Sequence, residues 1–421
     1  MEFGISGKAC AGSRGRQAAD NGTLSACHQE HALKKLGIFG YYGYENTGDE
    51  AILASLKRGL KQAIPDIDPV VFSGNSDYTA SMHEISSVAE VLPRRPADWI
   101  VRSLGRNRSE FFRSWAAFRA CDAFLFGGGG LFYDHPDSHA YLDNLFNRIE
   151  QCKRSGRKVA VAGVSIGPLH HAASRSRLGE VLNQVDAFIV RDRPSAELAV
   201  ECGVDPDRVQ VTADLVFLLE AAQKEQALEA LAREGVEDSG RPMIGLCLYG
   251  RASEANGLDP MLVSFCRWLI AEYDCSILLV PMQTSTEFDD RPFARRFAKQ
   301  LGKSERIHAL QGPYSPAVTM AIMNQCEAIV AMRLHGAILA INNGTPLLGL
   351  NYMPKVERLF HEIGQPEWQI PVAELNEEWL RDGFTALWED RSHRRHQLEA
   401  ALRSRQEAAQ KTFELLRKAL I

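Results

Sequence analysis

An arginine and a histidine two residues apart are the side chains best suited to chemistry in this sequence. Arg333 and His335 follow the apolar run Ala328–Met332 and precede the apolar run Gly336–Ile341. The first run predicts a buried strand and the second a helix, which places both side chains at a strand-to-helix turn. Free N–H groups and the helix dipole attract anions there, and arginine adds a planar fork and histidine a proton. We therefore predict that Arg333 and His335 bind a small anionic donor and act in catalysis.

Two other residues are candidates for the donor site. Gly336 opens the predicted helix, and Arg191 closes the apolar run Ala187–Val190, where it could supply a second cation. The alternatives are structural. Arg191 could form a salt bridge with Asp192 or Asp214, while Arg333 could pair with a neighbouring carboxylate and His335 could cap its helix.

A polar loop follows the first apolar run of the ordered sequence. Residues 40–50 read GYYGYENTGDE, which does not match the GxGxxG dinucleotide fingerprint. Asp49 at the predicted helix start would repel a pyrophosphate laid on that turn. We interpret the loop as one that presents Asn46 and backbone N–H groups to a sugar or an anion. The alternative is a glycine turn with a capped helix.

Two glycine-rich segments also stand at predicted strand ends. Gly127–Gly130 follows a run that ends at Phe126, and it would either let the backbone approach a ligand closely or form a mobile hinge. It lacks the Gly-Lys-Ser/Thr ending of a phosphate-binding loop, which argues against an NTPase. Residues 163–168 contain no GxSxG, so Ser165 is not expected to be a hydrolase nucleophile.

Short apolar runs alternate with longer helical patterns along most of the chain, which predicts parallel sheets covered by helices on both faces. The predicted strands are 35–40, 69–72, 123–126, 158–164, 187–190 and 209–212, and then 243–248, 276–281, 306–309, 328–332 and 346–350. The expected fold is α/β, with two doubly wound Rossmann-like domains that face a cleft. Ligands bind at the carboxyl ends of such strands, where the residues above lie.

The segment 217–238 is rich in Ala, Glu, Lys and Gln and shows no strand pattern, so we place the boundary between the domains near 215–240. The predicted organisation is a disordered leader or a sequence added for expression at 1–34, an N-terminal domain on the acceptor side at 35–215, a linker or helix at 216–240, a C-terminal domain on the donor side at 241–375, and helices packing across both domains at 376–421.

The composition excludes several classes of function. A net charge of −5 gives no reason to expect nucleic acid as a partner. The nine cysteines include no CxxC pair, which favours buried thiols in a reducing compartment over disulfides or zinc ligands. No apolar segment approaches the ~20 residues that span a bilayer, and residues 1–34 lack the apolar core of a signal peptide. We expect a cytoplasmic protein.

One stretch is basic in spite of the acidic whole. Residues 94–119 contain seven arginines, two acidic residues and five Trp or Phe side chains. Such a helix fits peripheral contact with anionic lipid headgroups at the inner face of the cell membrane, and the alternative is an ordinary solvated helix.

Taken together, these motifs resemble the polysaccharide pyruvyltransferases, above all the CsaB-type enzymes that pyruvylate secondary cell-wall polymers. The resemblance covers about residues 36–360 and rests on the order of GYENTGDEA at 43–51, GGGGLF at 127–132, GVSIGP at 163–168, Arg-Asp at 191–192 with Ser195, and MRLHG at 332–336.

The resemblance implies a GT-B-like fold, no metal and no cofactor, with phosphoenolpyruvate as the donor substrate. It implies a lipid-linked disaccharide as acceptor, commonly ending in β-linked N-acetylmannosamine, and a 4,6-linked pyruvate ketal as product. The family's Arg-x-His motif binds the donor, which corresponds to Arg333 and His335 here, whereas the spacing does not fix the role of Arg191. The motifs that contain Asn46, Asp49, Gly128 and Gly129 would then lie on the acceptor side.

We hypothesise that His335 protonates the methylene carbon of phosphoenolpyruvate and that Arg333 orients its carboxylate or phosphate. The main alternative is a GT-B glycosyltransferase that uses a nucleotide sugar. A non-catalytic carbohydrate-binding protein agrees less well with an α/β core that carries Arg and His at a helix start. An NAD-dependent oxidoreductase agrees less well because the first glycine loop lacks the dinucleotide fingerprint.

Overall fold

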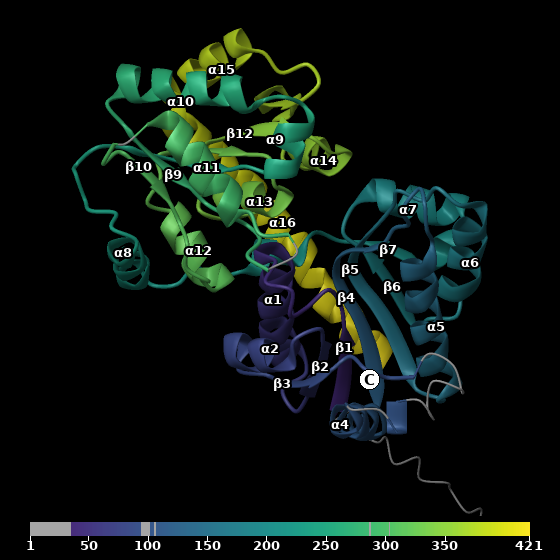
Figure 1. The fold of residues 1–421 in the computed structure, drawn as a ribbon. Helices are drawn as coiled ribbons and strands as arrows, with labels where there is room; N and C mark the ends of the chain where they lie inside the picture. Colours follow the sequence, from purple (N-terminus) through teal and green to yellow (C-terminus); the bar gives the residue numbers. More distant parts are fainter. Residues whose placement is uncertain (1–34, 94–101, 105–106, 286–287, 303) are drawn as a thin grey trace, which may run out of the picture. The chain divides into compact units, whose positions relative to one another are not determined.

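The computed structural model describes residues 35–93, 102–104, 107–285, 288–302 and 304–421. Its first half forms a seven-stranded parallel sheet in the order β3-β2-β1-β4-β5-β6-β7 (Figure 1). The strands are β1 (Lys35–Phe39), β2 (Asp68–Ser73), β3 (Ser86–Ala89), β4 (Ala123–Phe132), β5 (Lys158–Ile166), β6 (Ala187–Val190) and β7 (Val209–Val211).

Helices cover both faces of this sheet because successive side chains of each strand point to opposite sides. Leu36 and Ile38 of β1 belong to one apolar cluster, and Phe39 belongs to another, where it stacks on Phe72 and Phe126. The helices of this half are α1 (Thr47–Ala63), α2 (Ser76–His83), α4 (Arg108–Ala120), α5 (Ala140–Arg154), α6 (Ala172–Leu182) and α7 (Arg193–Glu201), followed by the 3-10 turns η1 (Pro206–Arg208) and η2 (Leu215–Leu218).

The second half forms a six-stranded parallel sheet in the order β10-β9-β8-β11-β12-β13. The strands are β8 (Met243–Cys247), β9 (Ser276–Leu279), β10 (Ile307–Ala309), β11 (Ala328–Ala331), β12 (Leu347–Asn351) and β13 (Gln369–Pro371). The helices are α8 (Lys224–Arg233), α9 (Gly250–Ala255), α10 (Asp259–Tyr273), α11 (Arg291–Leu301), α12 (Pro316–Met323), α13 (Leu334–Asn342) and α14 (Pro354–Glu362), with the turn η3 (Pro366–Trp368). Both sheets are therefore doubly wound, and their order reverses between β1 and β4 and between β8 and β11.

Two helices complete the chain, α15 (Glu377–Glu389) and α16 (Arg391–Leu420). The long helix α16 contacts β5 of the first sheet and α13 of the second half (yellow in Figure 1). Its Phe413 ring lies against Gly59 of α1, so closely that a Cβ at Gly59 would overlap the ring. One apolar cluster consequently runs from α1 through α16 to α13.

The strands predicted at 123–126 and 158–164 prove longer, as β4 and β5, and the length of β4 corrects both the predicted strand end at Phe126 and the hinge interpretation of Gly127–Gly130. β4 continues through the glycines to Phe132, because Gly127 and Gly129 pair with Ala162 and Val164 of β5, and Phe132 pairs with Ile166 after a register shift. Gly128 and Gly129 have φ values of 75° and 74°, which glycine adopts without strain. The edge strands β3 and β13 were not predicted; each has only three or four residues.

The predicted membrane segment lies partly outside the described residues, which omit 94–101 and 105–106. In its described part, Phe111 and Phe118 of α4 are buried and Trp115 packs against the core, whereas Phe112 is 46% exposed. Most of these aromatic side chains therefore stabilise the first domain, and membrane contact stays a prediction.

The seven cysteines within the described ranges are free and buried, in agreement with their prediction as buried thiols. No helix among the described residues is long and apolar enough to cross a membrane.

Candidate functional site

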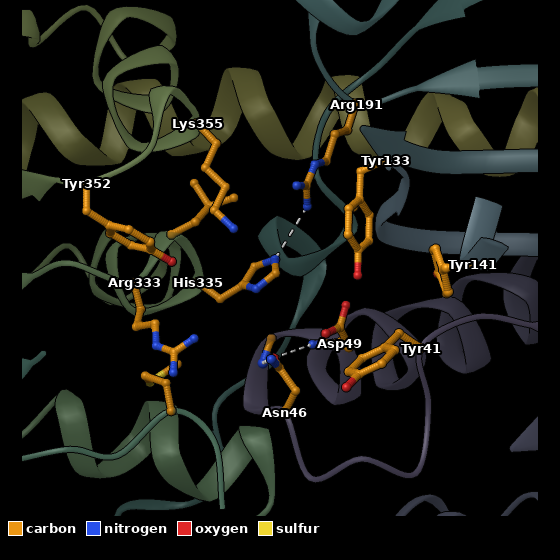
Figure 2. Close-up of a pocket in the computed structure, with 14 residues that line it drawn as sticks. Tyr41, Asn46, Asp49, Tyr133, Tyr141, Arg191, Arg333, His335, Tyr352 and Lys355 are labelled. Atoms are coloured by element: carbon orange, nitrogen blue, oxygen red, sulfur yellow. Dashed lines mark hydrogen bonds between the residues drawn. The ribbon is translucent and has the colours of Figure 1, made fainter. Parts of the chain in front are cut away.

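A cavity of about 190 Å³ lies where the strand orders of both sheets reverse. Such switch points leave a crevice at the carboxyl ends of the strands, into which the following loops project. Its lining comes from the end of β4 and from segments that follow β1, β4, β6, β9, β11 and β12, as Figure 2 shows for the labelled side chains. The lining residues are Tyr41, Asn46, Gly48, Asp49, Gly130, Tyr133, Tyr141, Arg191, Met282, Arg333, Leu334, His335, Tyr352 and Lys355.

Arg333 and His335 both line this cavity at the N-terminus of α13, where the sequence places them. Arg333 is the residue before the helix, and its Nη2 donates to both carboxylate oxygens of Asp290, at 2.7 and 2.8 Å. Its guanidinium also lies 4.0 Å from the centre of the Tyr249 ring. The predicted alternative, a pair with a neighbouring carboxylate, is thus present. The Asp290 carboxylate accepts from only one nitrogen of Arg333, Nη2, and it holds the rest of the guanidinium at the cavity wall.

His335 is packed from three sides. Its Nδ1 lies against Gly48 of α1, where a Cβ would overlap the ring. Its Nε2 lies 3.5 Å from Oδ2 of Asp214 and 3.5 Å from Nη1 of Arg191. Burial lowers the pKa of His335, and the Arg191 charge adds to the effect against the opposing pull of Asp214. The imidazole is therefore neutral at pH 7, so an acid role requires that it gain a proton when an anion binds.

Arg191 points into the cavity from the end of β6. Its Nη1 pairs with Asp214, and its Nε donates to Oγ of Ser165 at 2.6 Å. Arg191 and Asp214 expose only 6% and 7% of their side chains. The alternative of a salt bridge with Asp214 is therefore observed, and the same arginine still contributes positive charge to the cavity.

We expect the Asp214→Ala variant to lose about 3–5 kcal/mol of unfolding free energy, because it leaves a buried guanidinium without its carboxylate. Although burial opposes ionisation, Arg191 and His335 hold the pKa of Asp214 well below its usual range. A carboxyl with a depressed pKa stabilises the fold at neutral pH and loses that contribution as the pH falls below about 4.

Urea unfolding at pH 7 and at acidic pH measures both effects. The control is Glu229→Ala, which removes a surface pair with Arg233 that is 70% exposed on each side and should cost less than about 1 kcal/mol. Equal losses in the two variants would contradict the assignment of Arg191–Asp214 as a buried pair that stabilises the fold.

Lys355 and Tyr352 are cavity residues that the sequence analysis missed. Lys355 lies in the first turn of α14, just after β12, and its ammonium points toward the cavity (Figure 2). Burial lowers the pKa of Lys355 to about 8, with further lowering by Arg191 and Arg333. The available signal was positional, since Lys355 follows a predicted strand end as Arg333 does.

Asn46 is the N-cap residue of α1, and its side chain also contacts the loop after β9. Its side-chain oxygen accepts from the N–H groups of Gly48 and Asp49 at 3.0 and 3.3 Å, and its Nδ2 donates to Gln283 at 3.2 Å. Thr47 adds a backbone hydrogen bond to Met282. Asn46 also lines the cavity, so the two interpretations of this loop, a capped helix and a polar loop that presents Asn46, each describe part of it.

The glycines that were predicted to contact a ligand, Gly128, Gly129 and Gly336, do not line the cavity, so their role is in packing. Gly130 lines the cavity, whereas a Cβ at Gly128 would overlap Ile52 and one at Gly129 would overlap the Asp49 carboxylate. Gly128 and Gly129 therefore let α1 approach β4 and support Asp49. Gly336 is buried in the first turn of α13, where an added Cβ would lie 2.8 Å from Cβ of Cys247.

Asp49, Tyr41, Tyr133 and Tyr141 line the cavity on the side away from Arg333 and Lys355, as Figure 2 shows. Burial raises the pKa of Asp49 to about 7, against the lowering effect of Arg191. The rings of Tyr133 and Tyr141 lie 5.1 Å apart.

Within the described ranges, no group of three or more His, Cys, Asp or Glu residues has an arrangement that could hold a metal ion.

A family model described as polysaccharide pyruvyl transferase matches residues 46–353 of the chain. The amylovoran biosynthesis protein AmsJ of Erwinia amylovora is 21% identical over 379 residues, which cover 81% of this chain and 89% of AmsJ.

Solved structures with the same fold include a UDP-GlcNAc 2-epimerase of Neisseria meningitidis bound to UDP-GlcNAc, with a TM-score of 0.58 and 15% identity over 92% of this chain and 100% of that one. A glycosyltransferase from Rickettsia africae has a TM-score of 0.57 and 12% identity, over 92% of this chain and 99% of the other. These likenesses confirm the predicted GT-B-like fold of two Rossmann-like domains.

Proposed function

The chain belongs to the polysaccharide pyruvyl transferase family, and we propose that it transfers pyruvate from phosphoenolpyruvate to a lipid-linked precursor of a cell-wall glycan. In this proposal the acceptor sugar is β-linked N-acetylmannosamine, as in CsaB-type enzymes. The product is a 4,6-linked ketal, and phosphate is released. Phosphoenolpyruvate is a substrate, and no further cofactor enters the proposal.

The observation that supports this donor is the convergence of Arg191, Arg333 and Lys355 with the N-terminus of α13 on one small cavity. Phosphoenolpyruvate carries a carboxylate and a phosphate, and both groups are suited to guanidinium forks, an ammonium and free helix N–H groups. Because Asp290 and Asp214 hold the two arginines from the sides away from the cavity, the cations are in place before the donor arrives.

The proposed reaction adds a proton to the methylene carbon of the donor and leaves a cation-like centre at C2. His335 supplies this proton, since its neutral imidazole can take one up when the donor's negative charge raises its pKa. A sugar hydroxyl attacks C2, the second hydroxyl closes the ring, and the C2–O bond to phosphate breaks. One hydroxyl proton balances the proton added to carbon, and the other leaves with phosphate.

The direct test incubates the protein with phosphoenolpyruvate and a set of lipid-linked disaccharide analogues that differ in their terminal sugar. We expect acceptor-dependent phosphate release and a mass gain of one pyruvyl ketal on the analogue ending in β-N-acetylmannosamine. Phosphate release without a mass gain on any analogue would contradict pyruvyl transfer.

A GT-B glycosyltransferase with a nucleotide-sugar donor is the alternative, since it shares the fold. A cavity of about 190 Å³ is small beside the ~300–1,000 Å³ of sites for larger ligands, which favours the smaller donor. Release of a nucleotide from a sugar nucleotide in the same incubation would support the alternative.

We also propose that the enzyme acts at the cytoplasmic face of the membrane, where a lipid-linked acceptor would be presented. The arginine-rich segment 94–119 would contact anionic headgroups there.

A further inference from the structure

Asp49 is a cavity carboxylate that the fold leaves without a partner. It lies half-buried in the first turn of α1, and among the described residues no hydrogen bond or salt bridge reaches its side-chain oxygens. The neighbouring carboxylates differ, because Asp214 pairs with Arg191 and Asp290 pairs with Arg333. Removing a carboxylate from water without a partner costs stability, so its presence in the cavity points to a chemical role.

The surroundings place this carboxylate opposite the proposed acid. Gly129 leaves the space that the Asp49 side chain fills, and His335 approaches from the other side, against the adjacent Gly48. Figure 2 shows the Asp49 carboxylate directed at the cavity between Tyr133 and Tyr41. The charged groups that act on it are Arg191 from the end of β6, Lys355 from α14, Glu50 from α1 and Asp214 before η2.

We propose that Asp49 is the general base of the reaction, which accepts the proton of the attacking sugar hydroxyl in an acceptor subsite walled by Tyr133 and Tyr141. This inference rests on the proposed pyruvyl transfer. As the hydroxyl O–H bond breaks, its proton moves to an Asp49 oxygen while the sugar oxygen bonds to C2 of the donor. The proton that Asp49 holds is then released to the departing phosphate or to water.

The ionisation of the cavity groups agrees with this division of roles. The pKa of Asp49 is raised by burial to about 7, close to the value that suits a base at neutral pH. Burial also raises the pKa values of Tyr133 and Tyr141, so both phenols keep their protons and can donate hydrogen bonds but cannot act as the base. Lys355, with a pKa of about 8, is the competing base, and it lies on the donor side.

The two tyrosines provide a surface for the acceptor. Tyr133 and Tyr141 each expose 41% of their area beside the cavity, although they are large aromatic residues. Aromatic rings with a polar end bind ligands that have both an apolar face and hydroxyl groups, and a pyranose ring has both. A sugar placed on these rings would present its hydroxyls to Asp49.

The experiment compares Asp49→Asn with Asp77→Asn, which makes the same chemical change at an exposed carboxylate in the first turn of α2. The substrates are phosphoenolpyruvate and a soluble disaccharide analogue ending in β-N-acetylmannosamine. We expect Asp49→Asn to lower kcat by about 10²–10⁴-fold, with phosphoenolpyruvate binding by calorimetry within about threefold of wild type, and Asp77→Asn to match wild type.

The pH profile separates a base from a residue that only shapes the site. In the wild type the acceptor kcat/KM should rise with pH as Asp49 loses its proton near pH 7, and this rise should be absent from Asp49→Asn. A rise that persists in Asp49→Asn, or a kcat within threefold of wild type, would overturn the inference and leave pyruvyl transfer standing. A wild-type protein that transfers no pyruvate would overturn both.

The aromatic wall is tested with the pair Tyr141→Ala and Tyr141→Phe. Loss of the ring should raise the acceptor KM about tenfold or more, while the dissociation constant of phosphoenolpyruvate stays within about threefold, and Tyr141→Phe should retain most of the affinity. An unchanged acceptor KM in Tyr141→Ala would exclude the tyrosine subsite.

Discussion

Replacing His335 by alanine is expected to lower kcat by about 10²–10⁴-fold, the usual contribution of a positioned acid or base. The imidazole is the titratable group at the N-terminus of α13 that faces both Arg191 and the cavity. Proton delivery to the donor's methylene carbon requires it in the charged form. Because burial lowers the pKa of His335, that form is scarce at neutral pH and becomes scarcer as the pH rises.

Below the Lys355 pKa of about 8, the donor kcat/KM of the wild type should therefore fall with increasing pH, and this part of the fall should be absent from His335→Ala. The matched control is His361→Ala, an exposed histidine at the end of α14 that lies outside the cavity lining. Near-normal turnover of His335→Ala would exclude His335 as the acid, whereas a loss shared by His361→Ala would indicate damage to the fold.

Replacing Lys355 by methionine should weaken phosphoenolpyruvate binding by about 10–150-fold, since a hydrogen bond to a charged group contributes about 1.5–3 kcal/mol. The length of the side chain is conserved, so the loss reports the ammonium. With a pKa of about 8, the wild-type ammonium loses its charge as the pH rises through 8, and donor affinity should fall over the same range. Calorimetric titration from about pH 6.5 to about pH 9 measures this pH dependence of phosphoenolpyruvate affinity.

The control is Lys355→Arg, which keeps its charge throughout the range and should bind the donor with little dependence on pH. Stability supplies an independent readout. A partly buried lysine with a lowered pKa destabilises the fold while it is charged, so Lys355→Met should unfold at a higher temperature than the wild type at pH 7. Lower stability together with unchanged donor affinity would assign Lys355 a purely structural role.

Much of the fold could be predicted because its signals are local. Runs such as Ala328–Met332 are too short and too apolar for anything but buried strands, and their alternation with helical patterns implies parallel sheets. The strands that escaped prediction, β3 and β13, lie at sheet edges and have no apolar run of their own. The end of β4 was misplaced because glycine suggests a loop, whereas pairing with β5 holds the glycines in a strand.

The residue pattern along the chain was enough to place Arg333, His335 and Arg191 at strand ends, because a strand end and the following helix start are local features of the sequence. The groups that surround these side chains depend on how distant segments pack together. Arg191 and His335 are 144 residues apart in sequence and meet at 3.5 Å, and Asp49 acquires its raised pKa from burial between the two sheets. Burial and electrostatic interactions depend on distances in space. Asp49, the carboxylate without a partner among the described residues, and Lys355, the third cation, therefore stand out only in the folded protein, where both line one cavity.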